Sequence, residues 1–299
     1  MPTLFFFVPS LSRARRASLW RLLVLTGCSG GMQSGVRTPA PAPAPAAPPP
    51  VAVVSTWRPA YPTTPVAYRV QVDTRLARDS AGSREDAPVQ TTARVAIAWP
   101  SVSGGARRVQ GRVSEFVIGG SDRIADPAVR AAPLVATFEG SVDSVAVRVS
   151  LVPALANECD APQTAALALA RELLVRWPAA LTIGQTWRDS SVTFVCRGGV
   201  PMTSRVRARY EVRGGADSSA LDVVRVAEVD LSGEVRQPFR AVRVRGRGTG
   251  EHHFFLDRAS GMLSRVEGSS TTELSVIDAA RGGEQRVRQT ATFRAQREP

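Results

Sequence analysis

The sequence predicts a mostly β domain of the α+β class, an antiparallel curved sheet or half-barrel with one principal helix. Apolar and polar residues alternate with a period of two over much of the chain after about residue 61. Turn-rich pieces such as Asp79–Ser83 and Ser103–Gly105 separate these runs, which favours antiparallel neighbours. One stretch, at about 162–177, has the period of a helix instead.

The first predicted strands lie between residues 66 and 151. Val66, Tyr68, Val70 and Val72 alternate with polar or small residues, so one face is apolar and the other is wet. Similar alternation recurs at 95–99, 109–113 and 145–151. These runs indicate a first group of strands before the helix.

The helix has signals for both of its ends. Asp160 can cap it, Pro162 suits its first turn and Pro178 ends it. Its apolar stripe consists of Leu167, Ala170, Leu173, Leu174 and Trp177, and its opposite side carries Arg171, Glu172 and Arg176. We expect the stripe to pack on the concave or open face of the sheet. A lipid-sensing amphipathic helix is the alternative, and the narrow, barely basic polar face argues against it.

A second group of strands follows the helix, so we expect two β halves joined through it. The predicted strands are 192–196, 204–212, 221–229, 241–247, 251–255, 262–267, 272–277 and 285–293. Asp257–Gly261 is typical of a hairpin turn. The glycines of Gly246–Gly250 indicate a bulge or sharp bend rather than a phosphate cradle, because no strand-to-helix context follows them.

Length and charge limit the functional classes. The 299 residues can bury a substantial core, and the formal net charge is +12. A basic protein can approach a lipid surface or an anionic envelope polymer. The chain has neither an arginine-rich helix nor a stacking aromatic motif, so nucleic acid is not an expected partner.

The N-terminal segment combines a basic arm, Arg13–Arg21, with an apolar run that ends in Leu25-Thr26-Gly27-Cys28. This pattern resembles the signal peptide and lipobox of bacterial lipoproteins. The resemblance implies that residues 1–27 are a signal peptide and that Cys28 carries acyl chains such as palmitate in a membrane. A non-acidic Ser29 implies the outer membrane, facing the periplasm. Beyond the lipobox, the chain only loosely resembles uncharacterised envelope lipoprotein β domains.

A spacer is expected between the anchor and the folded part. Pro and Ala alternate from Pro39 to Pro50, a composition that favours extended polyproline II over a packed core. Residues 28–60 are therefore predicted to be a lipid-anchored, Pro/Ala-rich disordered linker. Residues 61–299 are predicted to form a single β-rich domain.

Two cysteines remain if Cys28 is lipidated. Cys159 and Cys196 are an even number in a compartment that permits disulfides, so we predict a bond between them. Loop-closure entropy would make that bond worth about 3 to 4 kcal/mol. Free buried cysteines are the alternative. A metal site is less favoured because no histidine lies near either cysteine.

No catalytic, metal or cofactor site is predicted. His252 and His253 are adjacent, so in a strand they point to opposite faces and cannot chelate one ion together. Two rows of alternating arginines place guanidinium groups on one face, where they form either a solvated surface or an anion-facing strip. The rows are Arg205, Arg207, Arg209, Arg243, Arg245 and Arg247.

Three functional hypotheses remain. The first is a non-enzymatic envelope lipoprotein with a binding or scaffold role. The second is a carrier that holds a lipid or other apolar ligand between sheet and helix, which requires an apolar cavity there. The third is a periplasmic hydrolase, which requires one of the histidines to meet a carboxylate and a nucleophile.

Overall fold

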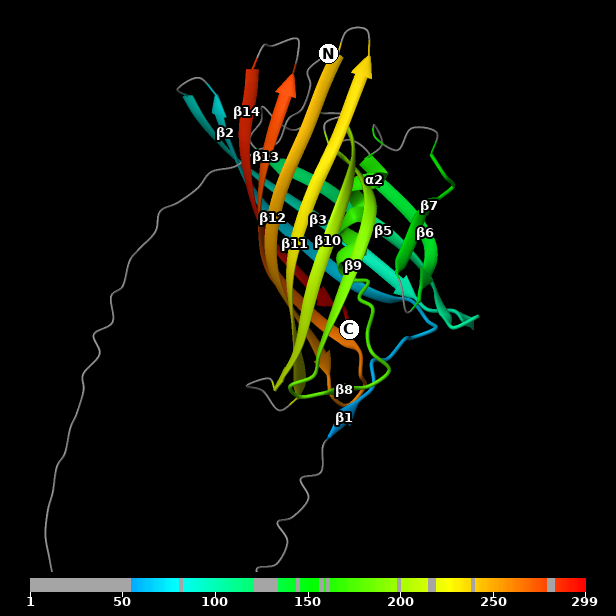
Figure 1. Cartoon of the computed structure of the whole chain (residues 1–299). Coiled ribbons are helices and arrows are strands. Elements are labelled where there is room, and N and C mark those ends of the chain that lie inside the picture. The colour runs from blue at the N-terminus through cyan, green and yellow to red at the C-terminus, as the bar shows by residue number, and fades with distance from the viewer. Residues whose placement is uncertain are drawn as a thin grey trace, which may run out of the picture. The chain divides into compact units, whose positions relative to one another are not determined.

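One antiparallel sheet curves into a half-barrel, with helix α2 (Pro162–Glu172) packed on its inner side (Figure 1). This confirms the predicted fold class. The computed structural model describes residues 55–80, 83–120, 134–143, 146–155, 159, 162–197, 200–214, 219–237, 240–278 and 283–299. The strands are β2 (Val66–Ser80), β3 (Ser83–Ala98), β4 (Val102–Ser103), β5 (Ala106–Gly120), β6 (Leu134–Val142), β7 (Val147–Val152), β9 (Thr186–Arg197), β10 (Val200–Gly214), β11 (Ala220–Gln237), β12 (Arg240–Asp257), β13 (Leu263–Asp278) and β14 (Gly283–Arg297).

The sheet consists of two halves, as predicted, one on each side of the helix in sequence. Its strand order is β7-β6-β5-β3-β2-β14-β13-β12-β11-β10-β9, with β4 beside β5. The halves meet where β14 lies beside β2 and Arg297 is opposite Tyr68. The backbone N–H of Glu298 also donates to the carbonyl of Ala67. The last described strand therefore joins the second half to the first.

The core lies between the helix and the inner face of the sheet. Ala166, Leu167 and Ala170 are buried on the helix and join one apolar cluster with residues of both halves, such as Phe138 and Phe254. Burial of apolar area is the main favourable term in folding, so this contact holds the helix in place. No helix within the described ranges is long and apolar enough to cross a membrane.

The helix ends at Glu172, five residues before the predicted end at Trp177. Leu173, Leu174 and Val175 are all buried, and three consecutive side chains cannot share one helical stripe. The chain tightens instead: the Leu173 N–H donates to the carbonyl of Ala170, three residues back. Beyond the helix, Trp177 packs edge-on against Trp187 and Phe254.

Two predicted strand breaks do not occur. Residues 241–247 and 251–255 belong to the single strand β12. All of 262–267 except Met262, together with 272–277, belongs to β13. The β12–β13 register runs unshifted through Gly246–Gly250, and its irregularity lies at Phe255/Leu256. The glycines allow close packing instead, since a Cβ on Gly246 would lie 2.3 Å from the side chain of Leu274.

The described fold begins before residue 61. β1 (Thr56–Trp57) pairs with β8 (Leu181–Thr182) in a separate two-stranded ladder. Next to it, the predicted hairpin turn is present: the Gly261 N–H donates to the Asp257 carbonyl, and Gly261 has φ of 69°. A Cβ on Gly261 would lie 2.2 Å from the carbonyl oxygen of Arg58, so this turn requires glycine.

Candidate functional site: the open seam of the sheet

The sheet has two end strands, β7 and β9, and a cleft lies between them. The cleft has a volume of about 420 Å³. Its walls come from β5, β6 and β7 on one side and from β9 on the other, with Arg171 of α2 between them. Helix α2 contacts both end strands. We call this hollow, where the half-barrel stays open, the seam cleft.

Arg171 bridges the two edges from the last turn of α2. Its guanidinium donates to the Val149 carbonyl of β7 at 3.0 Å and to the Phe194 carbonyl of β9 at 3.4 Å. Paired strands lie about 4.8 Å apart and bond directly. Here the Arg171 side chain lies between the β7 and β9 edges. The distance between these edges is therefore larger than the spacing of a strand pair, but one guanidinium reaches both of them.

The register shows which backbone groups face the cleft. The Val149 and Phe194 carbonyls accept from Arg171, so they point away from their partner strands β6 and β10. Alternate residues of an antiparallel strand point the same way, so the N–H and C=O of Val192 also face the cleft. All neighbouring pairs on the eleven-strand path are antiparallel, so β7 and β9 run in the same direction.

The β9 edge carries exposed apolar side chains. Val192 is 69% exposed and Phe194 is 50% exposed. Proteins usually protect a long edge strand with charges, proline or a covering segment, because an unprotected edge can pair with another chain. Among the described residues, the part of β9 that lines the cleft carries neither a charge nor a proline on its outer face, which is typical of a surface that receives a partner.

The cleft is more basic than acidic. Arg108, Arg148 and Arg171 line it, against one acidic side chain, Glu139. Arg148 forms an ion pair of 2.6 Å with Asp143 but stays 63% exposed. Arg108 is exposed and makes no ion pair with any described residue. The wall from β5 to β7 therefore favours an anionic ligand.

A disulfide fastens β9 beside the cleft. Cys159, which precedes α2, is bonded to Cys196 near the end of β9, with Cα atoms 4.9 Å apart. This confirms the predicted pairing. Farther along β9, Asp189 forms an ion pair of 2.9 Å with Arg176. β9 is thus held to the helical segment at both sides of the cleft residues.

The predicted arginine rows lie on the outer face of β10 and β12, where all six arginines are exposed. β11 runs between the rows and adds an acidic row, Glu228, Asp230 and Glu234. These acids pair with Arg207, Arg243 and Arg247 at 3.2 to 3.5 Å. Arg205, Arg209 and Arg245 make no ion pair within the described residues. An anion-facing role stays a hypothesis for those three.

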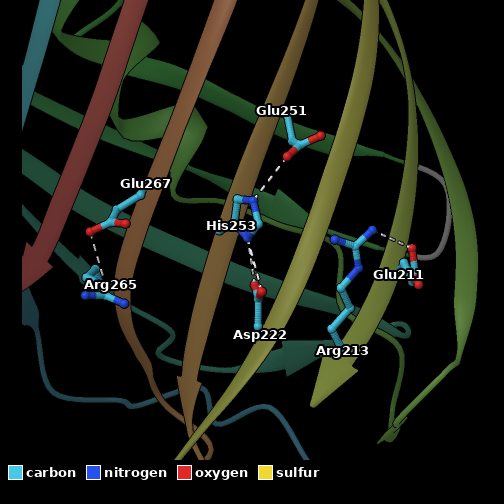
Figure 2. A network of polar contacts seen from close by, with 7 residues as sticks. All are labelled: Glu211, Arg213, Asp222, Glu251, His253, Arg265 and Glu267. Atoms are coloured by element: carbon cyan, nitrogen blue, oxygen red, sulfur yellow. Dashed lines mark hydrogen bonds and ion pairs between the residues drawn. The ribbon is translucent and has the colours of Figure 1, made fainter. Parts of the chain in front are cut away.

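His253 lies on the same outer face, in the network that Figure 2 shows. Its Nδ1 is 3.1 Å from Asp222 and its Nε2 is 3.2 Å from Glu251. Partial burial would lower the pKa of His253, but the hydrogen bonds and charges of the two carboxylates outweigh it and raise the pKa. Because both nitrogens already face carboxylates, neither is placed to take a proton from a nucleophile.

His252 points the other way, as predicted for adjacent strand residues. It is 7% exposed, and its Nδ1 has no hydrogen-bond partner among the described residues. Burial, together with the charge of Arg225, lowers the pKa of His252 to about 4. Its ring is therefore neutral at pH 7. In the parts of the chain that the structure describes, no three His, Cys, Asp or Glu side chains gather as a metal site.

An ion pair ties the end of α2 to the inner face of the sheet. Arg225 donates to Glu172 at 2.5 Å, with side-chain exposures of 14% and 40%. Burial would raise the pKa of Glu172, but the charge of Arg225 and this hydrogen bond lower it. The sequence placed Glu172 on the polar side of the helix, and the structure places it against the sheet.

A small apolar cavity lies between the sheet and the segment that follows α2. Trp99, Leu173, Trp177 and Leu256 are among its lining residues, and its volume is about 30 Å³. That is about the share of one water molecule in the liquid. This cavity is too small for an acyl chain.

Sequence reasoning located the disulfide but not the seam cleft. The two predicted halves made the cleft possible, yet nothing in the periodicity indicated which strands would be edges. Arg171 looked like a solvent-facing helix residue, although it bridges both edges. The predicted lipidation site, Cys28, lies outside the described residues. No protein-family model and no curated protein matches this chain.

Proposed function

We propose that this protein is a membrane-anchored envelope lipoprotein with a non-catalytic binding role, and that it binds its partner at the seam cleft. The observation that carries the binding role is a cleft of about 420 Å³ between two strand edges that do not pair with each other. The lipobox at Leu25–Cys28 and the Pro/Ala tract support an anchor with a spacer. The Cys159–Cys196 disulfide supports an oxidising compartment such as the periplasm.

The geometry favours this role over the two alternatives. A lipid carrier needs an apolar cavity between sheet and helix. The cavity lined by Trp99 and Trp177, beside the segment that follows the helix, has a volume of about 30 Å³. A histidine-dependent hydrolase needs a base with one free nitrogen near a nucleophile. His253 has a carboxylate at each nitrogen, and His252 is buried beside Arg225 and Phe254.

The anchor is tested by fractionating bacteria that express the full-length chain. The wild-type protein should sediment with membranes and have the mass of a chain that begins at Cys28 with acyl groups attached. Cys28→Ser should move it to the soluble fraction, whereas Cys159→Ser should leave it in the membrane. A Cys28→Ser protein that stays in the membrane fraction would refute the anchor. Ser29→Asp should shift the protein from the outer to the inner membrane.

The binding role is tested by native mass spectrometry of the protein purified from its own envelope. We expect a bound polypeptide and no small apolar ligand. A stoichiometric lipid in the Cys28→Ser protein, which has no lipid of its own, would favour the carrier instead. A cross-linkable residue at Ser190, on the exposed side of β9, should capture the partner, and one at Arg69 on the far part of the sheet should not.

A further inference from the structure

We propose that the seam cleft accepts an extended acidic polypeptide segment as an added β-strand between β7 and β9. This inference rests on the proposed binding role and names the ligand class of the same site. It follows from the direction of the two edges, the bonds of Arg171 to both of them, and the charges and apolar side chains around the cleft.

Strand direction allows one added strand to pair with both edges. β7 and β9 end a path of eleven antiparallel strands, so they run in the same direction. Two parallel edges cannot close an antiparallel sheet by pairing with each other in the same pattern. One further strand, antiparallel to both, would complete the ring and pair both edges. A sheet edge that takes up an extended peptide is a common recognition mode.

Arg171 marks the place of that strand. Its donors bond to the Val149 carbonyl and the Phe194 carbonyl, one on each edge. An inserted strand would offer backbone N–H groups to the same two carbonyls. Arg171 must then release at least one of them, and the backbone carbonyls of the inserted strand can accept from its guanidinium instead. The inserted backbone therefore replaces the bonds that it breaks.

Side chains around the cleft favour an alternating segment. An inserted strand would point one set of side chains outward, near Arg148 and Arg108, where acidic residues fit. The other set would point inward, toward the half-buried Val149 and Val195, where apolar residues fit. A second copy of β9 would instead bring another exposed Arg188 to a basic edge, which like-charge repulsion opposes.

The test measures binding of two synthetic peptides to the purified full-length protein. The first is acetyl-Val-Glu-Val-Glu-Val-Glu-Val-amide with a fluorophore, and the second has Lys in place of Glu. We expect the Glu peptide to bind and the Lys peptide to bind at least about tenfold more weakly. Arg108→Glu should reduce that preference. Equal binding of the two peptides, or no binding of either, overturns the proposal.

Val192→Pro tests the edge itself. The Val192 N–H faces the cleft rather than β10, so proline removes a docking donor without removing a β9–β10 bond. We expect Glu-peptide affinity to fall about tenfold, as for one lost hydrogen bond plus the steric effect of the ring. Val192→Ala keeps the N–H and should bind within about threefold of wild type. Circular dichroism checks that both variants fold.

Two further measurements separate the possible failures. Hydrogen exchange should slow at Val149, Val192 and Phe194 when the Glu peptide is added, and slowing confined to the outer arginine rows would overturn the proposal. Sedimentation should show a monomer, and a dimer that Val192→Pro dissolves would assign the edge to a second copy instead. Peptide binding does not require the lipid, so an anchored protein that binds neither peptide refutes this inference and leaves the anchor intact.

Discussion

The inner and outer faces of the β11–β12 pair shift the pKa of the same type of side chain in opposite directions. His252 faces inward beside Arg225, and its pKa is lowered to about 4. His253, the next residue, faces outward between Asp222 and Glu251, and its pKa is raised. The inner ion pair, Arg225–Glu172, joins helix to sheet, whereas the outer pairs join neighbouring strands. An ionic contact on the inner face therefore holds the structure together, whereas one on the outer face, a single residue further along the strand, can be replaced.

The largest expected effect comes from breaking the inner ion pair. Glu172→Leu leaves the Arg225 charge with little solvent, and we expect the free energy of unfolding to fall by about 3 kcal/mol. This loss lies at the lower end of the range for breaking a buried ion pair, because 40% of the Glu172 side chain is exposed. Urea denaturation measures it.

The outer face provides the matched control for that change. Glu228→Leu removes a partner of Arg207 where both side chains are about two-thirds exposed, and we expect a loss below about 1 kcal/mol. The double variant Glu172→Leu/Arg225→Met should regain most of the lost stability. Equal losses for the two single variants would show that the faces do not differ.

The next effect is a pH dependence from His252. Its unfolded pKa is near 6.5 and its folded pKa is about 4, so the unfolded state takes up the proton first as pH falls. The stabilisation is present above pH 6.5 and is lost toward pH 4, by about 2 to 3 kcal/mol. His253, with a raised pKa, acts in the opposite direction. Urea titrations across this range should show a flatter curve for His252→Phe, and an unchanged slope would contradict the prediction.

A smaller effect is expected from filling the space beside His252. A Cβ on Gly268 would lie 2.4 Å from the His252 ring, so Gly268→Ala should destabilise by about 1 to 3 kcal/mol. The control is Gly119→Ala, where the nearest atom is the Gln90 carbonyl oxygen at 3.7 Å. Thermal melting of both variants should separate them. If the Gly268→Ala protein has the same melting temperature as wild type, the His252 ring moves freely to make room for the added methyl group.

The smallest effect concerns the outer histidine. Asp222→Asn removes the charge next to Nδ1, so the pKa of His253 should fall toward its ordinary value. The free energy of unfolding at pH 7 should change by only a few tenths of a kcal/mol, as for other partly exposed pairs. An NMR titration of the imidazole measures the pKa. An unaltered value would assign the shift to Glu251.

Local sequence patterns predicted the presence of the helix and strands better than the residues at which they begin and end. Period two identified most strands, and the spacing of Leu167, Ala170 and Leu174 identified the helix. The strand at Leu134–Val142 was not predicted, although buried Ala136 and Phe138 alternate with exposed residues there. In the sequence, the glycines of β12 resemble a strand break. Their role is to leave room for side chains of β13, and periodicity does not show which β13 residues lie opposite them.

The candidate site was less predictable because it depends on long-range pairing. An edge strand and a central strand can have the same alternation, and only the sheet order shows that β7 and β9 are edges. Arg171 is one of many arginines, and its two carbonyl partners lie 22 and 23 residues away in different halves. The disulfide was predictable because only Cys159 and Cys196 remain once Cys28 is assigned to the predicted lipobox, which leaves few alternatives.

The contact between β14 and β2 has a consequence for the order of folding. Each half is a series of hairpins whose partners are close in sequence, so each can begin to form locally. Arg297 opposite Tyr68 and the Glu298–Ala67 bond join the far ends of the described chain. Such a contact forms late, because bringing distant segments together is slow. The sheet therefore cannot be completed until β14 has left the ribosome, and a chain truncated before β14 would lack the strand pair that joins the two halves of the sheet.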